Sequence, residues 1–232
     1  MTAISRRDTL AWMAAAAASP YLAGQAQGAP NAAIAGASPW RDMVLTPLKA
    51  RGYGKDAKLT EPSVPWPLTL KPHRRRQLRL AAGLILPADG RSPSADSLPI
   101  DAFIDEWISA PYPQQREDRV TVLSGLAWLD AESRRRAGKD FTQVDDATRR
   151  AIFDAIAWKD RIAPDYAKPA QFFARLRALM LGGFYSLPEG MADIGYLGNT
   201  PIAGDYPGPT DEALAHLNLG LARIGIKPVS AG

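Results

Sequence analysis

The chain has no cysteine and only two histidines, His73 and His216, among its 232 residues. Without thiols it cannot attach a c-type haem, hold an iron–sulfur cluster, bind zinc through thiolates or use a cysteine nucleophile. Two histidines exclude a three-histidine metal site, and a site of two histidines and a carboxylate would have to join the first and last predicted helices. We therefore expect no metal site in this chain.

The sequence also lacks the motifs of common nucleotide-binding and hydrolytic sites. It contains no G-x-G-x-x-G turn, no phosphate-binding P-loop and no G-x-S-x-G nucleophile elbow. Its acidic clusters, Asp101/Asp105/Glu106 and Asp145/Asp146, fall in or near the first turns of predicted helices, where the helix dipole favours carboxylates. We interpret both clusters as structural, so we predict no catalytic residue and no cofactor in this chain.

A strong excess of one charge is absent as well. The 28 Lys and Arg face 24 Asp and Glu, for a net charge of +4. So small an excess is not typical of a basic binding surface, and we expect no nucleic-acid partner.

The first residues have the order of an export signal. Arg6 and Arg7 precede an apolar run over residues 10–18, and small residues follow to a small-x-small site near Ala26. That run is too short to span a bilayer, which needs about 20 helical residues. We predict a twin-arginine signal peptide over residues 1–29; the alternative is an amphipathic helix with a chance arginine pair.

This signal has a consequence for the location of the protein, because the twin-arginine route carries folded substrates. We therefore expect a protein that folds in the cytoplasm and resides in the periplasm, associated with a membrane only indirectly, through a partner. About 200 residues remain after cleavage, which suits one domain with one sizeable core.

Apolar residues recur at helical spacing over most of the remaining chain, and few stretches alternate with period two. We predict an all-α fold, a single compact domain of about six helices over residues 68–222, followed by a tail over residues 223–232. The predicted helices cover residues 73–86, 100–110, 114–137, 145–158, 169–182 and 211–222, the last of them capped by Thr210.

Two segments show no such period. Residues 30–67 are rich in Gly, Pro, Ala and Ser but contain Trp40 and Trp66. We predict that they form an irregular arm that lies on a surface of this protein or of a partner; a mobile linker is the alternative.

Residues 182–209 combine turn residues with aromatic rings, and loops this long are uncommon without a function. We predict a partner-docking loop there, with the candidates Phe184, Tyr185, Tyr196, Asn199 and Tyr206.

The remaining candidates are interpreted as structural. His73 and the following arginines at residues 74–76 are expected to form a solvated helix start, with a docking patch for an acidic surface as the alternative. His216 is expected in the core or at its boundary. Three tryptophans in predicted helices are expected in the core: Trp107, Trp128 and Trp158.

Three groups of motifs follow one another along the chain. The first is RLAAGLILP at residues 79–87, and the second is GLAWLD at 125–130 with GKDF at 138–141. The third consists of FFARLR at 172–177, GFYS at 183–186, GM at 190–191, IGY at 194–196, GNTP at 198–201 and YPGP at 206–209. In this order they resemble the gluconate 2-dehydrogenase subunit 3 family from Leu68 to about Leu217. Residues 187–190 (LPEG) depart from a Ser/Thr-Glu-Pro variant that is frequent in the family.

The resemblance implies a small subunit without a redox centre. In such complexes a large flavoprotein subunit of the glucose-methanol-choline type holds FAD and the active site, and a cytochrome c subunit with haem c often takes the electrons onward. The small subunit then supports folding, stability and export of its partner, in a periplasmic dehydrogenase acting on CH-OH groups of a sugar or polyol. Two alternatives remain: a free-standing periplasmic helical enzyme, and a small-ligand binding protein with a pocket lined by tryptophans.

Overall fold

The computed structural model describes residues 37–54, 63–196, 198, 204 and 208–230. Within these ranges the regular structure is entirely helical, with seven α-helices, three short 3-10 helices and no β-strand. The predicted all-α fold is confirmed. The chain divides into two units, Met1–Gly195 and Tyr196–Gly232, which are described separately.

Six helices form the first unit, and five of them agree with the predicted segments to within a few residues. Pro72 and Pro113 each occupy the first turn of their helix, where a missing N–H costs nothing. Gly138 ends the longest helix at φ +70°, a conformation that favours glycine. The helices are α2 (Pro72–Ile85), α3 (Ile100–Ser109), α4 (Pro113–Ala137), α5 (Asp146–Ala157), α6 (Ala167–Tyr185) and α7 (Pro188–Asp193).

The predicted irregular loop begins later than expected. Helix α6 continues through Gly182 and Gly183 to Tyr185, and Pro188 then starts the short α7. Gly190 lets α7 lie against the end of α6, because a Cβ at Gly190 would come within 2.2 Å of the Phe184 carbonyl oxygen. The prediction of an irregular loop was therefore wrong for most of residues 182–193, where Gly183 and Gly190 allow close packing and do not form a turn.

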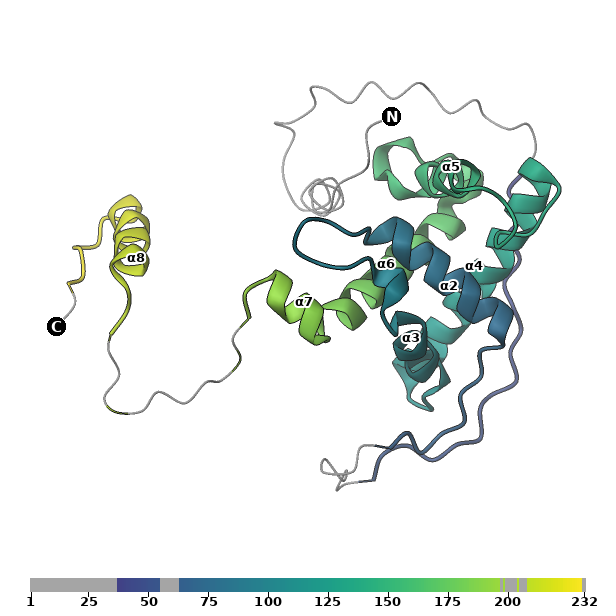
Figure 1. Ribbon diagram of the computed structural model, residues 1–232, viewed down its shortest axis with the longest axis horizontal. Helices are drawn as coiled ribbons and strands as arrows, with labels where there is room; N and C mark the ends of the chain where they lie inside the picture. The colour runs from purple at the N-terminus through teal and green to yellow at the C-terminus, as the bar shows by residue number, and fades with distance from the viewer. Residues whose placement is uncertain (1–36, 55–62, 197, 199–203, 205–207, 231–232) are drawn as a thin grey trace. The chain divides into compact units, whose positions relative to one another are not determined.

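Helix α6 occupies the middle of the first unit, in contact with α3, α4, α5 and α7 (Figure 1). Its Phe172, Leu176 and Met180 are fully buried, in the same core cluster as Leu126 and Leu129 of α4. The two helices approach closely at Gly125, where a Cβ would lie 2.0 Å from the Phe172 ring. Of the tryptophans expected in the core, Trp128 is buried, while Trp107 and Trp158 are half-buried.

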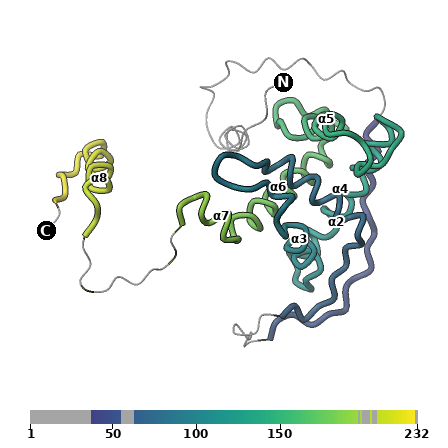
Figure 2. Tube along the Cα trace, viewed as in Figure 1, coloured from purple at the N-terminus to yellow at the C-terminus, as the bar shows by residue number. Residues whose placement is uncertain are grey.

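The described part of the arm, residues 37–54 and 63–67, is irregular and lies on the first unit. Figure 2 traces it, in purple and dark blue, along the outside of the helices and back to α2. Trp128 Nε1 donates a hydrogen bond of 3.0 Å to Ser38 Oγ, and Met43 N donates one of 2.9 Å to Ser124 Oγ. The arm was predicted to lie on a surface of this protein or of a partner, and its described part lies on this protein.

The second unit contains α8 (Asp211–Arg223), and Thr210 caps it by accepting a hydrogen bond of 3.2 Å from Ala213 N. The predicted cap is confirmed. No residue of α8 is buried, and His216 is exposed, so its expected place in or at a core was wrong. None of the helices in the described ranges is long and apolar enough to cross a membrane.

Candidate functional site

Three of the five docking candidates predicted from the sequence lie within the described residues. Phe184 is fully buried in the core, so the prediction that its ring docks a partner was wrong. Tyr185 is half-buried and its hydroxyl donates a hydrogen bond of 3.3 Å to Asp193 Oδ2. Tyr196 begins the second unit and is 57% exposed. The other predicted positions, Asn199, Tyr206, Arg6 and Arg7, lie outside the described residues.

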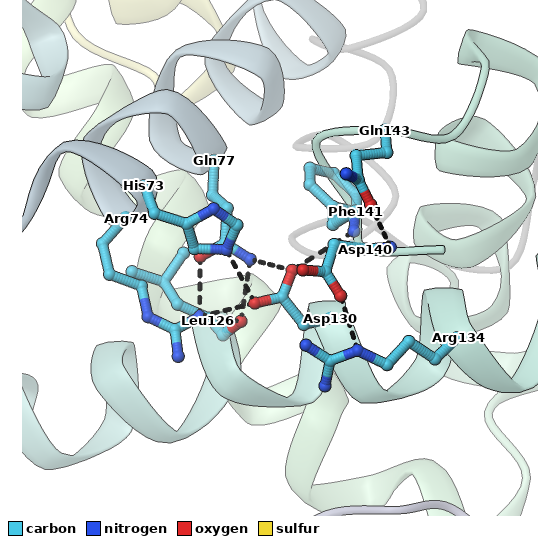
Figure 3. A network of polar contacts seen from close by, with 9 residues as sticks. All are labelled: His73, Arg74, Gln77, Leu126, Asp130, Arg134, Asp140, Phe141 and Gln143. Carbon is cyan, nitrogen blue, oxygen red and sulfur yellow. Dashed lines mark hydrogen bonds and ion pairs between the residues drawn. The ribbon is translucent and has the colours of Figure 1, made fainter. Parts of the chain in front are cut away.

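A buried polar network surrounds Asp130 of α4 (Figure 3). Its Oδ1 accepts hydrogen bonds from Gln77 Nε2 at 2.9 Å and from Phe141 N at 3.2 Å. Its Oδ2 lies 3.0 Å from Arg74 Nη1 and 2.9 Å from His73 Nε2. This carboxylate therefore joins α2, α4 and the turn after α4. The predicted helix start is confirmed, and the His73 side chain is 42% exposed. The prediction did not include the contacts of His73 and Arg74 with Asp130.

The same network contains a set of possible metal ligands. One ligand atom each from His73, Asp130 and Asp140 lies within 4.8 Å of the others. Both acids already have cationic partners, however: Arg74 is paired with Asp130, and Arg134 Nε lies 2.5 Å from Asp140 Oδ1. A cation at this position would have to displace two arginines. The donor set therefore fits a structural network better than a metal site.

Two further buried acids lie in α4, and each is enclosed by donors. Burial alone would raise the pKa of Glu132, but hydrogen bonds from Arg135, Arg136 and Tyr166 outweigh it and hold the pKa below its ordinary value. Asp118 behaves in the same way. Burial raises its pKa, whereas Arg175 of α6, the Trp107 indole and other donors lower it further than burial raises it. Carboxylates held ionised in this manner are poor proton acceptors at neutral pH.

The acidic cluster of α3 has a structural role, and Asp101 lies in the first turn of the helix as predicted. Asp101 pairs with Arg75 at 2.8 Å and with Arg79 at 3.2 Å, both on α2. Asp105 Oδ1 accepts hydrogen bonds of 3.0 Å from the backbone N–H groups of Thr69 and Leu70. These carboxylates thus fix the entry to α2. Asp145 acts at a helix start as well, since it caps α5 by accepting from Thr148 N.

The clearest candidate binding site is an aromatic pocket of about 300 Å³ between the arm, α3 and the start of α4. The Trp66 ring lies edge-on to Tyr53 and Tyr112, with centroid distances of 4.9 and 5.8 Å. Trp66 Nε1 donates to the Glu106 carbonyl oxygen at 3.1 Å, which fixes the arm over α3. We call this site the aromatic pocket, and its lining includes Tyr53, Trp66, Phe103, Glu106, Trp107 and Tyr112.

The aromatic pocket offers apolar ring faces and edges beside few polar groups. Such a lining suits an apolar or aromatic group. Sequence reasoning expected a tryptophan-lined pocket only for a small-ligand binding protein and could not say which tryptophans meet. Trp66 and Trp107 are 41 positions apart, and it is the fold of the arm that brings both into one lining.

The comparisons with known proteins agree with the motifs in the chain. Residues 72–208 match the model of the family described as gluconate 2-dehydrogenase subunit 3, from the start of α2 to the segment before α8. No curated protein and no solved structure gave a match. The family match covers more than half of the chain and includes the packing glycines Gly125, Gly183 and Gly190. The chain therefore belongs to the gluconate 2-dehydrogenase subunit 3 family.

Proposed function

We propose that this protein is the non-catalytic small subunit of a periplasmic FAD-dependent sugar or polyol dehydrogenase of the gluconate type. It binds the FAD-bearing large subunit, supports its folding and stability, and provides the twin-arginine signal for export. The family match over residues 72–208 carries this proposal, because the family is defined as a dehydrogenase subunit and so implies partner subunits. FAD belongs to the large subunit of the glucose-methanol-choline type, and haem c belongs to a cytochrome c subunit.

The chemistry of the chain supports a role without catalysis. The buried carboxylates Asp101, Asp105, Asp118, Asp130 and Glu132 each bind arginines or backbone N–H groups and hold helices together. The chain has no cysteine for a haem, a cluster or a thiol-based redox step. Hydride and electron transfer are therefore assigned to the partner subunits.

Co-expression tests the proposal directly. The full chain, tagged at its C-terminus, is expressed with the flavoprotein encoded next to it and recovered on an affinity resin. We expect the flavoprotein to co-purify with its flavin absorbance, and we expect its soluble yield to fall when the small subunit is omitted. A small subunit that is recovered alone and monomeric, beside a flavoprotein that folds equally well without it, contradicts the proposal.

A second candidate function is small-ligand binding, and the aromatic pocket favours it. A ligand in this pocket would contact Trp66 and Trp107, so it should change the tryptophan fluorescence of the purified chain. Trp158 lies outside the pocket lining and provides the control. The Trp66→Phe variant should lose most of the ligand-induced change and Trp158→Phe should keep it; equal changes in both variants would contradict binding in the pocket.

A further inference from the structure

Helix α2 carries positive charge that no acid within the helix balances. It contains four arginines and no acidic residue. One of the four, Arg74, belongs to the network around Asp130. The other three line a hollow of about 430 Å³ on α2, together with Pro72: Arg75, Arg76 and Arg79. We call these three side chains the arginine patch.

The buried carboxylate of Asp101 holds two of these arginines in place. Its Oδ2 lies 2.8 Å from Arg75 Nε and 3.2 Å from Arg79 Nη2, and its side chain is only 2% exposed. Each of these contacts uses one nitrogen of a guanidinium, so further N–H groups of Arg75 and Arg79 remain for another acceptor. Because both groups are held from within the fold, they are preorganised for a second anion at the surface.

Arg76 adds a positive charge without a counterion. It is exposed, and its side chain forms no hydrogen bond or ion pair with the residues that the structure describes. Three positive charges against the single negative charge of Asp101 leave the patch at +2. Arg79 lies three residues after Arg76 and four after Arg75, and like charges at these spacings destabilise a helix. The arrangement is therefore unfavourable in the isolated subunit and would be relieved by an external anion.

Other arginines of the first unit are matched by acids of this chain. Arg135 and Arg136 both bind Glu132, and Arg175 of α6 binds Asp118. The arginine patch differs from these pairs because its charge exceeds that of the acid beneath it. Such a surplus of guanidinium groups suits carboxylates, which arginine binds through parallel N–H bonds.

The shape of the arginine patch favours protruding acidic side chains over a lipid surface. The patch lines a hollow, whereas a membrane surface is flat. A helix that binds in the membrane interface also buries an apolar face there. On α2 the apolar face is buried within this protein, with the residues Leu78, Ala81, Ala82 and Ile85. Helix α2 therefore has a charged face to offer a partner, which suits a protein that presents carboxylates.

From these observations we propose that the arginine patch docks an acidic segment of the FAD-bearing large subunit, whose carboxylates accept hydrogen bonds from Arg75, Arg76 and Arg79. The inference rests on the proposed function, since it takes the large subunit as the partner. Attraction between the two charged surfaces steers association and fixes the register of the subunits. Salt weakens this attraction, because ions screen charges that are exposed to solvent.

The test measures dissociation of the co-expressed complex by surface plasmon resonance, with the large subunit immobilised. The variant Arg76→Glu reverses the charge of the arginine without a counterion. Arg116→Glu is the matched control, because Arg116 is an exposed arginine in the first turn of α4, which also begins with a proline. At about 0.1 M salt we expect dissociation about tenfold faster for Arg76→Glu and unchanged for Arg116→Glu. At about 1 M salt the difference should shrink to about twofold or less, because the Debye length is then only about 3 Å.

Thermal unfolding of the free chains shows whether the patch is balanced within this protein. Neither Arg76 nor Arg116 has a side-chain partner among the residues that the structure describes, so both variants should keep the midpoint of the unaltered chain. A lower midpoint for Arg76→Glu alone would mean that an acid of this chain pairs with the patch. Docking of the large subunit there would then be overturned.

The outcomes separate the two levels of inference. If the unaltered chain does not bind the large subunit, the proposed function itself is overturned. If it binds, and Arg76→Glu dissociates at the same rate, the arginine-patch inference is overturned while the proposed function stands. Vesicles of phosphatidylglycerol provide the last comparison. If Arg76→Glu abolishes binding to these vesicles and leaves the complex unchanged, the patch binds lipid headgroups, and docking on the large subunit is overturned.

Discussion

Glu132 shows how individual residues hold this fold together. The side chain has no exposed surface, and Arg135, Arg136 and Tyr166 all bond to it. Replacing it by Gln removes the charge and leaves two largely buried arginines uncompensated. We expect Glu132→Gln to lower the free energy of unfolding by about 3 kcal/mol, measured by urea denaturation followed by circular dichroism.

The control is an acid in a similar pair at the surface. Asp146 bonds to Arg149 within α5, but its side chain is 68% exposed. Solvent screening makes such a pair weak, so Asp146→Asn should change the free energy of unfolding by about 0.5 kcal/mol. Equal losses in the two variants would show that burial of Glu132 does not matter.

The same network predicts a pH dependence. The pKa of Glu132 lies below its ordinary value of 4.5 in the folded protein, because donors outweigh burial. Its contribution is therefore complete above about pH 4.5 and is lost as the pH falls through the lower folded pKa. Between neutral pH and pH 3, the Glu132→Gln variant should lose less free energy of unfolding than the unaltered protein. Parallel pH profiles for the two proteins would contradict this.

At the residue scale, sequence reasoning identified residue types better than their contacts. It treated Asp101 and Asp105 as structural, which they are. It could not identify the ion pair of Asp101 with Arg75 or the hydrogen bonds of Asp105 with the segment before α2, because such contacts cannot be read from spacing. It placed Phe184 in a loop, because Gly182 and Gly183 are typical turn residues. In the fold, Gly183 instead gives Phe103 room to pack, since a Cβ there would lie 2.8 Å from its ring.

At the scale of elements, the packing of α4 on α6 depends on the absence of a side chain at Gly125. A Cβ at this position would overlap the buried Phe172 ring at 2.0 Å. We expect Gly125→Ala to destabilise the protein by about 2 kcal/mol or more and to lower the thermal midpoint. Gly182→Ala in α6 is the matched control, because nothing lies within 4 Å of its added Cβ. It should stabilise the helix by up to about 1 kcal/mol, so a loss in both variants would refute the packing argument.

The helices themselves were largely predictable. Apolar spacing located α2 to α6 and α8, and proline and glycine marked their ends. Helix α7 was missed because its six residues are too few to show a period. For α8 the pattern correctly predicted an apolar face, but such a pattern does not say whether the face packs within the chain or on another protein. The aromatic pocket was beyond prediction for a related reason, since it depends on where an arm without any period lies.

At the scale of the whole molecule, the chain consists of two units, which is compatible with the proposed role of a subunit that supports a partner protein. The first unit has a hydrophobic core, against which Trp40 of the arm packs, whereas no residue of α8 in the second unit is buried. In the proposed function this chain carries no cofactor that would have to be loaded before export. A flavoprotein partner does, because FAD is bound as the protein folds, and the proposed twin-arginine route transports folded proteins.

Replacing both Arg6 and Arg7 by Lys tests whether this chain exports its partner. If the large subunit lacks a signal of its own, its export depends on these two arginines, and we expect dehydrogenase activity and both subunits to remain in the cytoplasmic fraction. Activity is measured with a dye acceptor after cell fractionation, and the subunits by immunoblot. The matched control replaces Arg41 and Arg51, two exposed arginines of the arm, by Lys and should leave export unchanged.

Normal periplasmic activity in the Arg6/Arg7 variant would show that the large subunit crosses the membrane by its own signal. The small subunit would then act on stability alone.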